Sequence, residues 1–189
     1  MKHAGSRELY AYWDKKRGKR PAPERAEIEP GAIRNVLSDA FILALDGGAG
    51  HPFRLAGTRV CALFGRELKS EPFIGLWAAA SQPTIADLMT TLDEEQVGTV
   101  AGVSAQNGDG EPIDLELLLL PLRSPRPSLA RTIGILAPLN VPKWLGPGPI
   151  GALNLGQRRH LGAALEARIL PRFMASHRRQ FVVHDGGRG

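Results

Sequence analysis

The segment Asn107-Gly-Asp-Gly110 lies between two apolar stretches and restricts the fold of this chain more than any other feature of its sequence. Asn-Gly and Asp-Gly pairs tolerate the left-handed backbone of tight hairpin turns, so the strands that they join run antiparallel. The flanking stretches, Val97–Ala105 and Ile113–Leu122, carry the apolar residues of strands. Because a further apolar stretch, Ala130–Leu139, follows a turn at Pro125–Pro127, the second half of the chain predicts a three-stranded antiparallel meander.

The first half of the chain predicts a hairpin followed by helices. Two strand-like stretches, Ala40–Asp46 and Phe53–Gly57, are separated by the turn sequence Gly47-Gly-Ala-Gly50. After them, residues 58–64 and 84–95 carry apolar side chains at helical spacing. A hairpin, a helical middle and a meander together predict an α+β domain with a five-stranded antiparallel sheet and helices on one face.

An amphipathic helix is predicted ahead of this domain. Leu9, Tyr10 and Trp13 share one helical face, and Pro21 and Pro23 then favour an extended linker. Such a helix covers either the sheet of its own chain or a partner. We expect the protein to form a homodimer in which these three side chains contact the second copy.

The positive charge of the chain is concentrated at its two ends. The net charge is +5 at pH 7, yet residues 27–152 hold nine basic and fourteen acidic residues. Residues 1–26 hold eight basic and three acidic residues, and residues 153–189 hold seven and two. We therefore divide the chain into a basic helix with a Pro-rich linker (1–26), a core domain (27–142), and a Gly/Pro linker with a basic tail (143–189).

The basic tail has the pattern of an amphipathic helix. Apolar residues from Leu161 to Phe173 recur at near-helical spacing, beside Arg158, Arg159 and further arginines. Such a helix binds anionic lipid, nucleic acid, an acidic protein surface or the acidic body of its own chain. Docking onto the chain's own body or onto a second copy is favoured. Nucleic acid, contacted by both basic ends, is the alternative.

Other function classes lack support in the sequence. The apolar stretches are shorter than the ~18 residues of a membrane-spanning helix, and the N-terminus lacks the apolar region of a secretory signal, so we expect a cytoplasmic protein. The single cysteine, Cys61, excludes an internal disulfide, and the five histidines lack metal-ligand spacing. Asp93-Glu94-Glu95 and the alternating pair Asp114 and Glu116 are assigned to solvated faces. No catalytic residue or metal site is therefore predicted, and we do not expect an enzyme.

Three strings of residues resemble a known family. They are Leu9-Tyr-Ala-Tyr-Trp-Asp14, Gly18-Lys-Arg-Pro-Ala-Pro-Glu-Arg-Ala-Glu-Ile-Glu-Pro30 and Phe53-Arg-Leu-Ala-Gly-Thr-Arg-Val-Cys-Ala-Leu-Phe-Gly-Arg-Glu-Leu68. Over residues 6–142 the chain is similar to the PAS-like family of alphaproteobacteria that was first catalogued as a domain of unknown function. This resemblance implies a PAS fold and an intracellular role in sensing or regulation, often as a stand-alone module, with a regulatory protein as partner and without catalysis.

In a PAS domain the helical segment and the sheet enclose a pocket. The side chains expected to line it here are Phe53, Leu55, Val60, Cys61, Phe64, Phe73, Trp77 and Leu88. They form either a packed core or a cavity for a small apolar or aromatic ligand, with Arg54 and Arg59 as candidate anion contacts. Haem is disfavoured because haem-binding PAS domains take their axial histidine from the central helical region, and residues 58–95 contain none. Flavin is disfavoured because Cys61 does not lie in the sequence that surrounds the reactive cysteine of flavin-binding sensors. The identity of the cofactor or ligand stays open.

Overall fold

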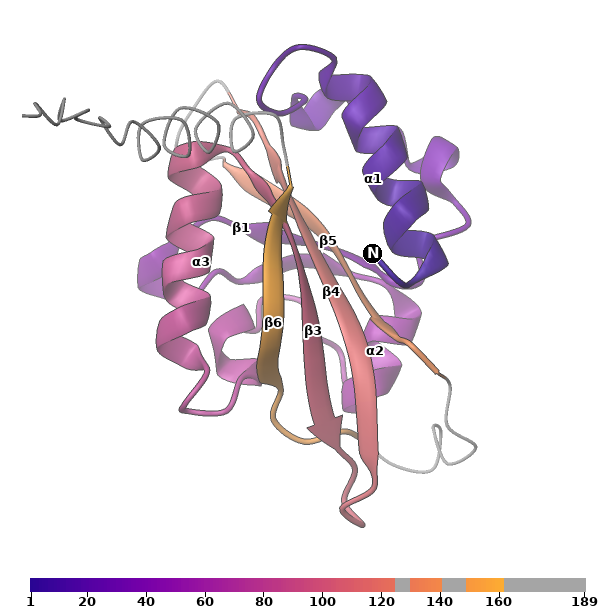
Figure 1. Cartoon of the computed structure of the whole chain (residues 1–189), viewed down its shortest axis with the longest axis vertical. Helices are drawn as coiled ribbons and strands as arrows, with labels where there is room; N and C mark the ends of the chain where they lie inside the picture. Colours follow the sequence, from indigo (N-terminus) through magenta and orange to yellow (C-terminus); the bar gives the residue numbers. More distant parts are fainter. Residues whose placement is uncertain (125–129, 141–148, 162–189) are drawn as a thin grey trace, which may run out of the picture.

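The computed structural model describes residues 1–124, 130–140 and 149–161. These residues form a six-stranded sheet in the order β2-β1-β5-β4-β3-β6, in which all neighbouring strands are antiparallel. The predicted hairpin is β1–β2, and the predicted meander is β3–β4–β5. The strands of the sheet are β1 (Ala40–Ala44), β2 (Phe53–Ala56), β3 (Gly98–Gln106), β4 (Pro112–Leu122), β5 (Arg131–Pro138) and β6 (Asn154–Leu161) (Figure 1).

The sixth strand corrects two predictions. β6 pairs with β3, with Val100 opposite Arg159 and Thr99 opposite His160. The sheet therefore has six strands rather than five, and Arg158–His160 are extended rather than the start of a basic helix. This pairing satisfies backbone groups of β3 that would otherwise lie at an open edge. The rest of the predicted tail helix falls on residues 162–189, which lie outside the described residues.

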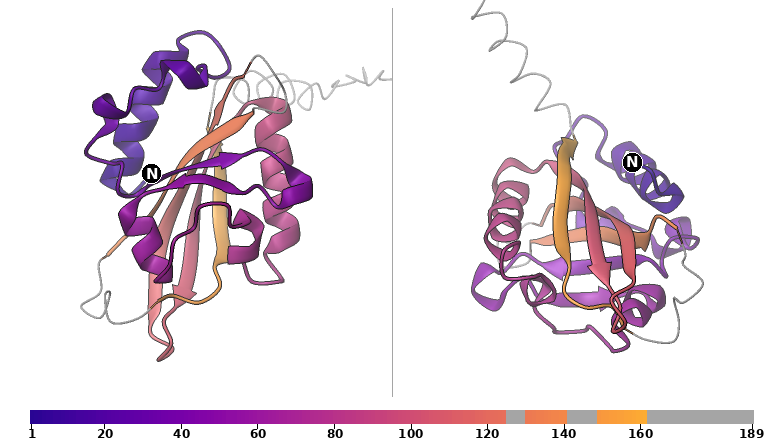
Figure 2. Two further views of the ribbon diagram at one scale, coloured as in Figure 1. Left: turned by 180° about the vertical axis from the view of Figure 1, so that it is seen from behind. Right: turned by 60° about the horizontal axis from the view of Figure 1, so that its bottom comes forward.

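One face of the sheet is covered by α2 (Thr58–Phe64), α3 (Gln82–Glu95) and the 3-10 segment η4 (Phe73–Leu76) (Figure 2). The apolar residues of α3 recur at helical spacing along its buried side. We call the packed layer on this face the inner core. It consists of Phe41, Leu43, Phe53, Val60, Cys61, Leu63, Phe64, Leu68, Phe73, Leu76, Trp77, Ile85, Leu88, Met89, Leu92, Ala101, Val103, Ala105, Ile113, Leu115, Leu117, Leu119, Leu136, Ile150 and Leu153.

The opposite face is covered by the N-terminal helix α1 (Ala4–Arg17) and two short 3-10 segments, η1 (Arg25–Glu27) and η2 (Pro30–Ile33) (Figures 1 and 2). Trp13 is 1% exposed, and its Nε1 donates a hydrogen bond of 2.8 Å to the carbonyl oxygen of Pro121. The helix therefore covers the sheet of its own chain. This outer core consists of Leu9, Trp13, Ala22, Ile28, Ile33, Val36, Ala40, Val100, Leu118, Leu120, Leu122, Ile133, Ile135, Ala137 and Leu161.

Strand β4 separates the two cores. Leu117 and Leu119 belong to the inner core, whereas Leu118 and Leu120 belong to the outer core. Successive side chains of a strand point to opposite faces, and here both faces are covered, so β4 is buried along most of its length. This double cover explains why the sequence of β4 contains an uninterrupted run of leucines.

The pairing of β1 with β2 contains a register shift. Ile42 is paired with Leu55, whereas the next residue, Leu43, is paired with Phe53. Arg54 is therefore an extra residue in β2, and it reverses the alternation of side chains along that strand. Phe53 points into the inner core, while Leu55 stays 48% exposed. This shift corrects the prediction that Leu55 lines the inner pocket.

Candidate functional site

The centre of the inner core is a group of four aromatic rings. Phe41 and Phe53 come from the first hairpin, and their ring centroids lie 5.6 Å apart. Phe73 of η4 lies 5.9 Å from Phe41 and 5.8 Å from Phe53. Trp77, which ends η4, contacts Phe73 edge-on at 5.7 Å. These spacings are those of favourable aromatic pairs, so η4 is fixed against the hairpin by ring contacts.

The indole of Trp77 has a buried donor without an acceptor. Trp77 is 2% exposed, and its Nε1 makes no hydrogen bond within the described part of the chain. Its backbone is well fixed, because its N–H donates to the carbonyl oxygen of Ile74 at 3.1 Å and its carbonyl oxygen accepts from Gln82 Nε2 at 2.9 Å. A buried donor without a partner costs about 1–3 kcal/mol. The inner core therefore contains one site that favours an added hydrogen-bond acceptor.

The structure brings together most of the residues predicted to line the pocket. Phe53, Val60, Cys61, Phe64, Phe73, Trp77 and Leu88 all belong to the inner core. Leu55 is the exception, because the register shift in β2 leaves it exposed on the outer face. The Cys61 thiol makes only long contacts, at 4.0 Å to the carbonyl oxygen of Ala56 and 3.8 Å to Glu67 Oε2. The binding of a ligand in this layer stays a prediction.

A hollow of about 220 Å³ lies between η4, α3 and the turn after β1, and a buried histidine lines it. His51 is 7% exposed, its backbone φ is 57°, and its Nδ1 has no hydrogen-bond partner among the described residues. Burial lowers the pKa of His51, although the charges of Asp46 and Asp93 oppose this effect. The imidazole is therefore held neutral. The sequence placed His51 in a turn and gave no sign of its burial.

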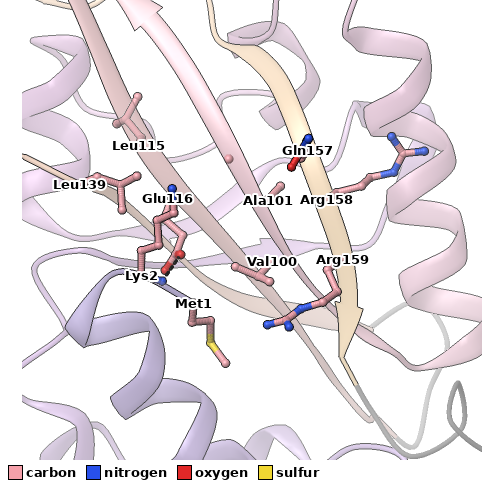
Figure 3. A pocket seen from close by; sticks show the side chains of 11 residues that line it. Met1, Lys2, Val100, Ala101, Leu115, Glu116, Leu139, Gln157, Arg158 and Arg159 are labelled. Carbon is pink, nitrogen blue, oxygen red and sulfur yellow. Dashed lines mark hydrogen bonds between the residues drawn. The ribbon is translucent and has the colours of Figure 1, made fainter.

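Another hollow, of about 380 Å³, lies on the outer face beside the start of the chain. Figure 3 shows Met1, Lys2 and Glu116 around it, with the Arg159 side chain on the same side and Arg158 pointing away. Both carboxylate oxygens of Glu116 accept hydrogen bonds from backbone amides, from Lys2 N at 2.5 Å and from His3 N at 3.0 Å. Glu116 thus anchors the segment that leads into α1.

The burial of Glu116 corrects its assignment to a solvated face. Glu116 is only 4% exposed, whereas its neighbour Asp114 is exposed as predicted. The physical reason is that the start of a helix has amide groups without partners and a partial positive charge, both of which favour a carboxylate. The sequence could not reveal this role because the helix lies more than a hundred residues away from the strand.

The residues predicted for the dimer interface are mostly occupied within the chain. Leu9 and Trp13 are buried in the outer core, so in this arrangement neither is available to a second copy. Tyr10 is half-buried and stacks on Trp13 with centroids 6.1 Å apart. The expectation of Leu9 and Trp13 as dimer contacts is therefore corrected, whereas the expectation of a dimer, and of Tyr10 in its interface, stays a prediction.

The two candidate anion contacts are not brought together. Arg59 pairs with Asp39 at 3.1 Å. Arg54 is exposed on β2, beside Leu55, and pairs with no carboxylate among the described residues. Of these two arginines, Arg54 is therefore the one whose charge no carboxylate of the described residues compensates.

Three of the eight basic side chains of residues 1–26 are paired with acids. Lys16 pairs with Glu29 at 2.6 Å, and Arg20 pairs with Glu27 at 2.9 Å. Arg17 pairs with Asp14 at 2.5 Å and lies over the ring of Trp13. These contacts reduce the number of charges that this segment can offer to a polyanion.

The described ranges also bear on metal binding and on membrane insertion. There, no group of three or more His, Cys, Asp or Glu side chains is arranged to hold a metal ion. None of the helices in those ranges is long and apolar enough to cross a membrane.

The chain matches one family of domains and is similar to solved structures. Residues 1–137 match the family described as the PAS domain. An RNA-binding light-oxygen-voltage receptor is 18% identical, with a TM-score of 0.44, and the match covers 58% of this chain and 33% of that chain. The PAS domain of an HTR-like protein from Haloarcula marismortui is 14% identical, with a TM-score of 0.40, and the match covers 57% of this chain and 89% of that one. No curated protein matches the sequence.

The chain spans about a third of the length of the first of these structures. The family match, in contrast, includes α1, the hairpin, the helical middle and the strands up to β5. It agrees with the expected fold, an antiparallel sheet with helices against its inner face. PAS domains are typically sensory or regulatory rather than catalytic, and this chain belongs to the PAS domain family.

Proposed function

We propose that the protein is a non-catalytic PAS sensor that binds a small molecule in its inner core and responds through contacts with a second copy or a regulatory protein. The observation that carries this proposal is the Trp77 Nε1 donor, which is buried in the inner core without an acceptor. A ligand with a carbonyl or a similar acceptor would satisfy this donor. The aromatic group beside it favours a ligand whose remaining surface is apolar or aromatic.

The response would reach the outer face through β4. Its leucines alternate between the two cores, so a ligand that shifts Leu117 or Leu119 also shifts the backbone that carries Leu118 and Leu120. These outer residues pack in the same layer as the buried side chains of α1. Closely packed layers transmit such displacements because they contain little free volume. The position of α1 on the sheet is therefore the proposed output.

Native mass spectrometry of the full chain tests the proposal. The wild-type protein is expected to retain a bound small molecule. Trp77→Phe is expected to lose it, because this variant keeps an aromatic ring at the position but lacks the indole N–H. Trp13→Phe is the matched control, since it makes the same change in the outer core, where the N–H already has the carbonyl of Pro121 as acceptor. This control variant should keep the ligand.

The two variants should also differ in stability without ligand. Both variants lose the same side-chain volume in a buried layer. Trp13→Phe also breaks an existing hydrogen bond, whereas Trp77→Phe removes a donor without a partner, so Trp13→Phe should cost about 1–2 kcal/mol more. If the wild-type protein carries no bound mass and Trp77→Phe loses as much stability as Trp13→Phe, the proposal of a ligand at Trp77 is wrong.

The alternative of a nucleic-acid-associated regulator has less support. Three basic side chains of the N-terminal segment already pair with acids, and Arg158 and Arg159 lie in the sheet. Binding to nucleic acid through the basic ends would weaken steeply with salt, because each phosphate contact releases counterions. Titration of single-stranded and duplex oligonucleotides at low and at physiological salt decides this alternative.

A further inference from the structure

The outer face of the sheet is not covered along its whole width. The outer core of α1 packs mainly over β3, β4 and β5, and the end formed by β1 and β2 is left with an open groove of about 570 Å³. The side chains that line this groove are Arg25, Ile42, Arg54, Leu55, Ser124 and Arg131. The described lining thus combines three arginines with two aliphatic side chains and contains no acid.

The three arginines come from separate parts of the chain. Arg25 begins η1, Arg54 is the extra residue of β2, and Arg131 begins β5. None of them pairs with a carboxylate in the described ranges. Arg131 is also the most enclosed of the three, and its Nη1 donates a hydrogen bond of 2.7 Å to the carbonyl oxygen of Ala130.

The convergence of these charges is electrostatically unfavourable in the absence of an anion. Burial lowers the pKa of Arg131, and the positive charges of Arg54 and Arg25 lower it further. Like charges that approach one another in a partly enclosed site disfavour the charged form. A bound anion would reverse this effect, because it interacts favourably with all three guanidinium groups.

The floor of the groove is apolar. Leu55 is paired with Ile42 across the two strands. Ile42 packs on the outer core, and Leu55 lies beside it on the outer face because Arg54 shifts the register of β2. Among the described residues, Leu55 is the large apolar side chain that remains exposed. An exposed leucine surrounded by arginines suits a ligand with an anionic end and an apolar or aromatic body.

We propose that this groove binds a small organic phosphate of nucleotide size, with its phosphate on the three arginines and its body on Ile42 and Leu55. Phosphate is favoured over a single carboxylate because its higher charge matches three cations, and guanidinium groups bind its oxygens in pairs. The volume of about 570 Å³ lies within the range of small-molecule sites.

Binding here would tie the linker behind α1 to the sheet. The linker is already attached by backbone hydrogen bonds, from Arg25 N to the carbonyl oxygen of Arg123 at 3.2 Å and from Arg123 N to that of Pro23 at 2.8 Å. A phosphate held by Arg25, Arg54 and Arg131 would add a bridge from the linker to β2 and β5. This site lies on the opposite side of the sheet from Trp77 and is independent of the inner-core ligand.

Isothermal titration of the full chain with ADP and with inorganic pyrophosphate at low salt tests the site. Arg54→Gln is expected to lower the affinity for both probes at least tenfold, and Arg25→Gln should act in the same direction. Arg66→Gln is the matched control, because Arg66 is equally exposed but pairs with Glu71 at 2.8 Å. Its effect should stay below twofold.

Leu55→Ser separates the two parts of the groove. It should weaken ADP binding several-fold and leave pyrophosphate binding unchanged, because only ADP has a body that reaches the apolar floor. Trp77→Phe should leave both affinities unchanged, which distinguishes this site from the proposed inner-core site. All four surface substitutions are at exposed positions, so circular dichroism should report an intact fold.

Three results would overturn the proposal. The first is that neither probe binds at low salt. The second is that Arg66→Gln and Arg54→Gln lower the affinity equally, which would indicate attraction to net charge alone. The third is that a single-stranded oligonucleotide binds more tightly than ADP and loses this binding in Arg54→Gln, which would assign the groove to nucleic acid.

Discussion

Replacement of Leu9 by alanine should destabilise the monomer, because Leu9 packs on the sheet of its own chain. The side chain is fully buried in the outer core. Its truncation removes three carbon atoms from an apolar environment, which costs about 2.4 kcal/mol at roughly 0.8 kcal/mol per carbon. The cavity left behind raises the total to about 3 kcal/mol. With a urea m-value of about 2 kcal/mol per molar, the unfolding midpoint should fall by roughly 1.5 M.

Urea unfolding followed by far-UV circular dichroism measures this effect, and Lys15→Ala is the control because Lys15 is exposed on the same helix. The control should shift the stability by less than about 0.5 kcal/mol. Dilution of the protein a hundredfold should not change the difference between Leu9→Ala and the wild type. If Leu9→Ala instead unfolds like the wild type at low concentration but no longer forms a dimer, α1 packs on a partner and the reasoning is wrong.

Three further predictions concern single side chains. Glu116→Gln keeps only one acceptor oxygen for the backbone amides of Lys2 and His3, so it should weaken the anchoring of α1 by about 1–2 kcal/mol. Faster hydrogen exchange in the first two turns of α1 measures this effect. The control, Glu111→Gln on the exposed hairpin, should not change the exchange of α1. Burial lowers the pKa of His51 in the folded state below its ordinary value of 6.5. As the pH falls, the unfolded chain therefore binds the His51 proton before the folded protein does. Stability should be greatest above about pH 6.5 and fall as the pH is lowered toward the folded pKa. His51→Asn, which tolerates the positive φ, should flatten the thermal midpoint between pH 5 and 7; an unchanged slope would mean that other groups cause it. Gly134→Ala would place a Cβ 2.4 Å from Phe41 Cζ and 2.5 Å from the carbonyl oxygen of Leu118. It should therefore lower the free energy of unfolding, measured in urea, by at least about 1–3 kcal/mol. The control Gly31→Ala, whose Cβ meets nothing within 4 Å, should lower it much less.

The elements with a clear periodicity were predictable from the sequence. The Asn-Gly turn defined the β3–β4 hairpin, and the spacing of Leu88 with its neighbours defined α3. β6 was not predictable, because Gln157, Arg158 and Arg159 do not alternate with apolar residues. The partner strand, rather than the local sequence, determines that this segment is extended.

The candidate site was predictable only where burial follows from residue type. Phe53, Phe73 and Trp77 belong to the inner core because large aromatic side chains are buried wherever two layers meet. The position of Leu55 depends on one extra residue in β2, and a single insertion leaves no trace in the composition of a strand. The role of Glu116 depends on partners that are distant in sequence. The burial of His51 depends on neighbours that the turn after β1 brings close to it.

The contact of Glu116 with the amides of Lys2 and His3 has a consequence for biosynthesis. The two ends of this contact are separated by more than a hundred residues. The sheet surface under α1 includes Leu118, Leu120 and Ile135, which are synthesised after α1, so this helix has no surface to cover until most of the domain has been made. Its apolar face stays exposed during that interval, and such exposure favours aggregation. α1 is therefore a segment that a chaperone would protect during synthesis.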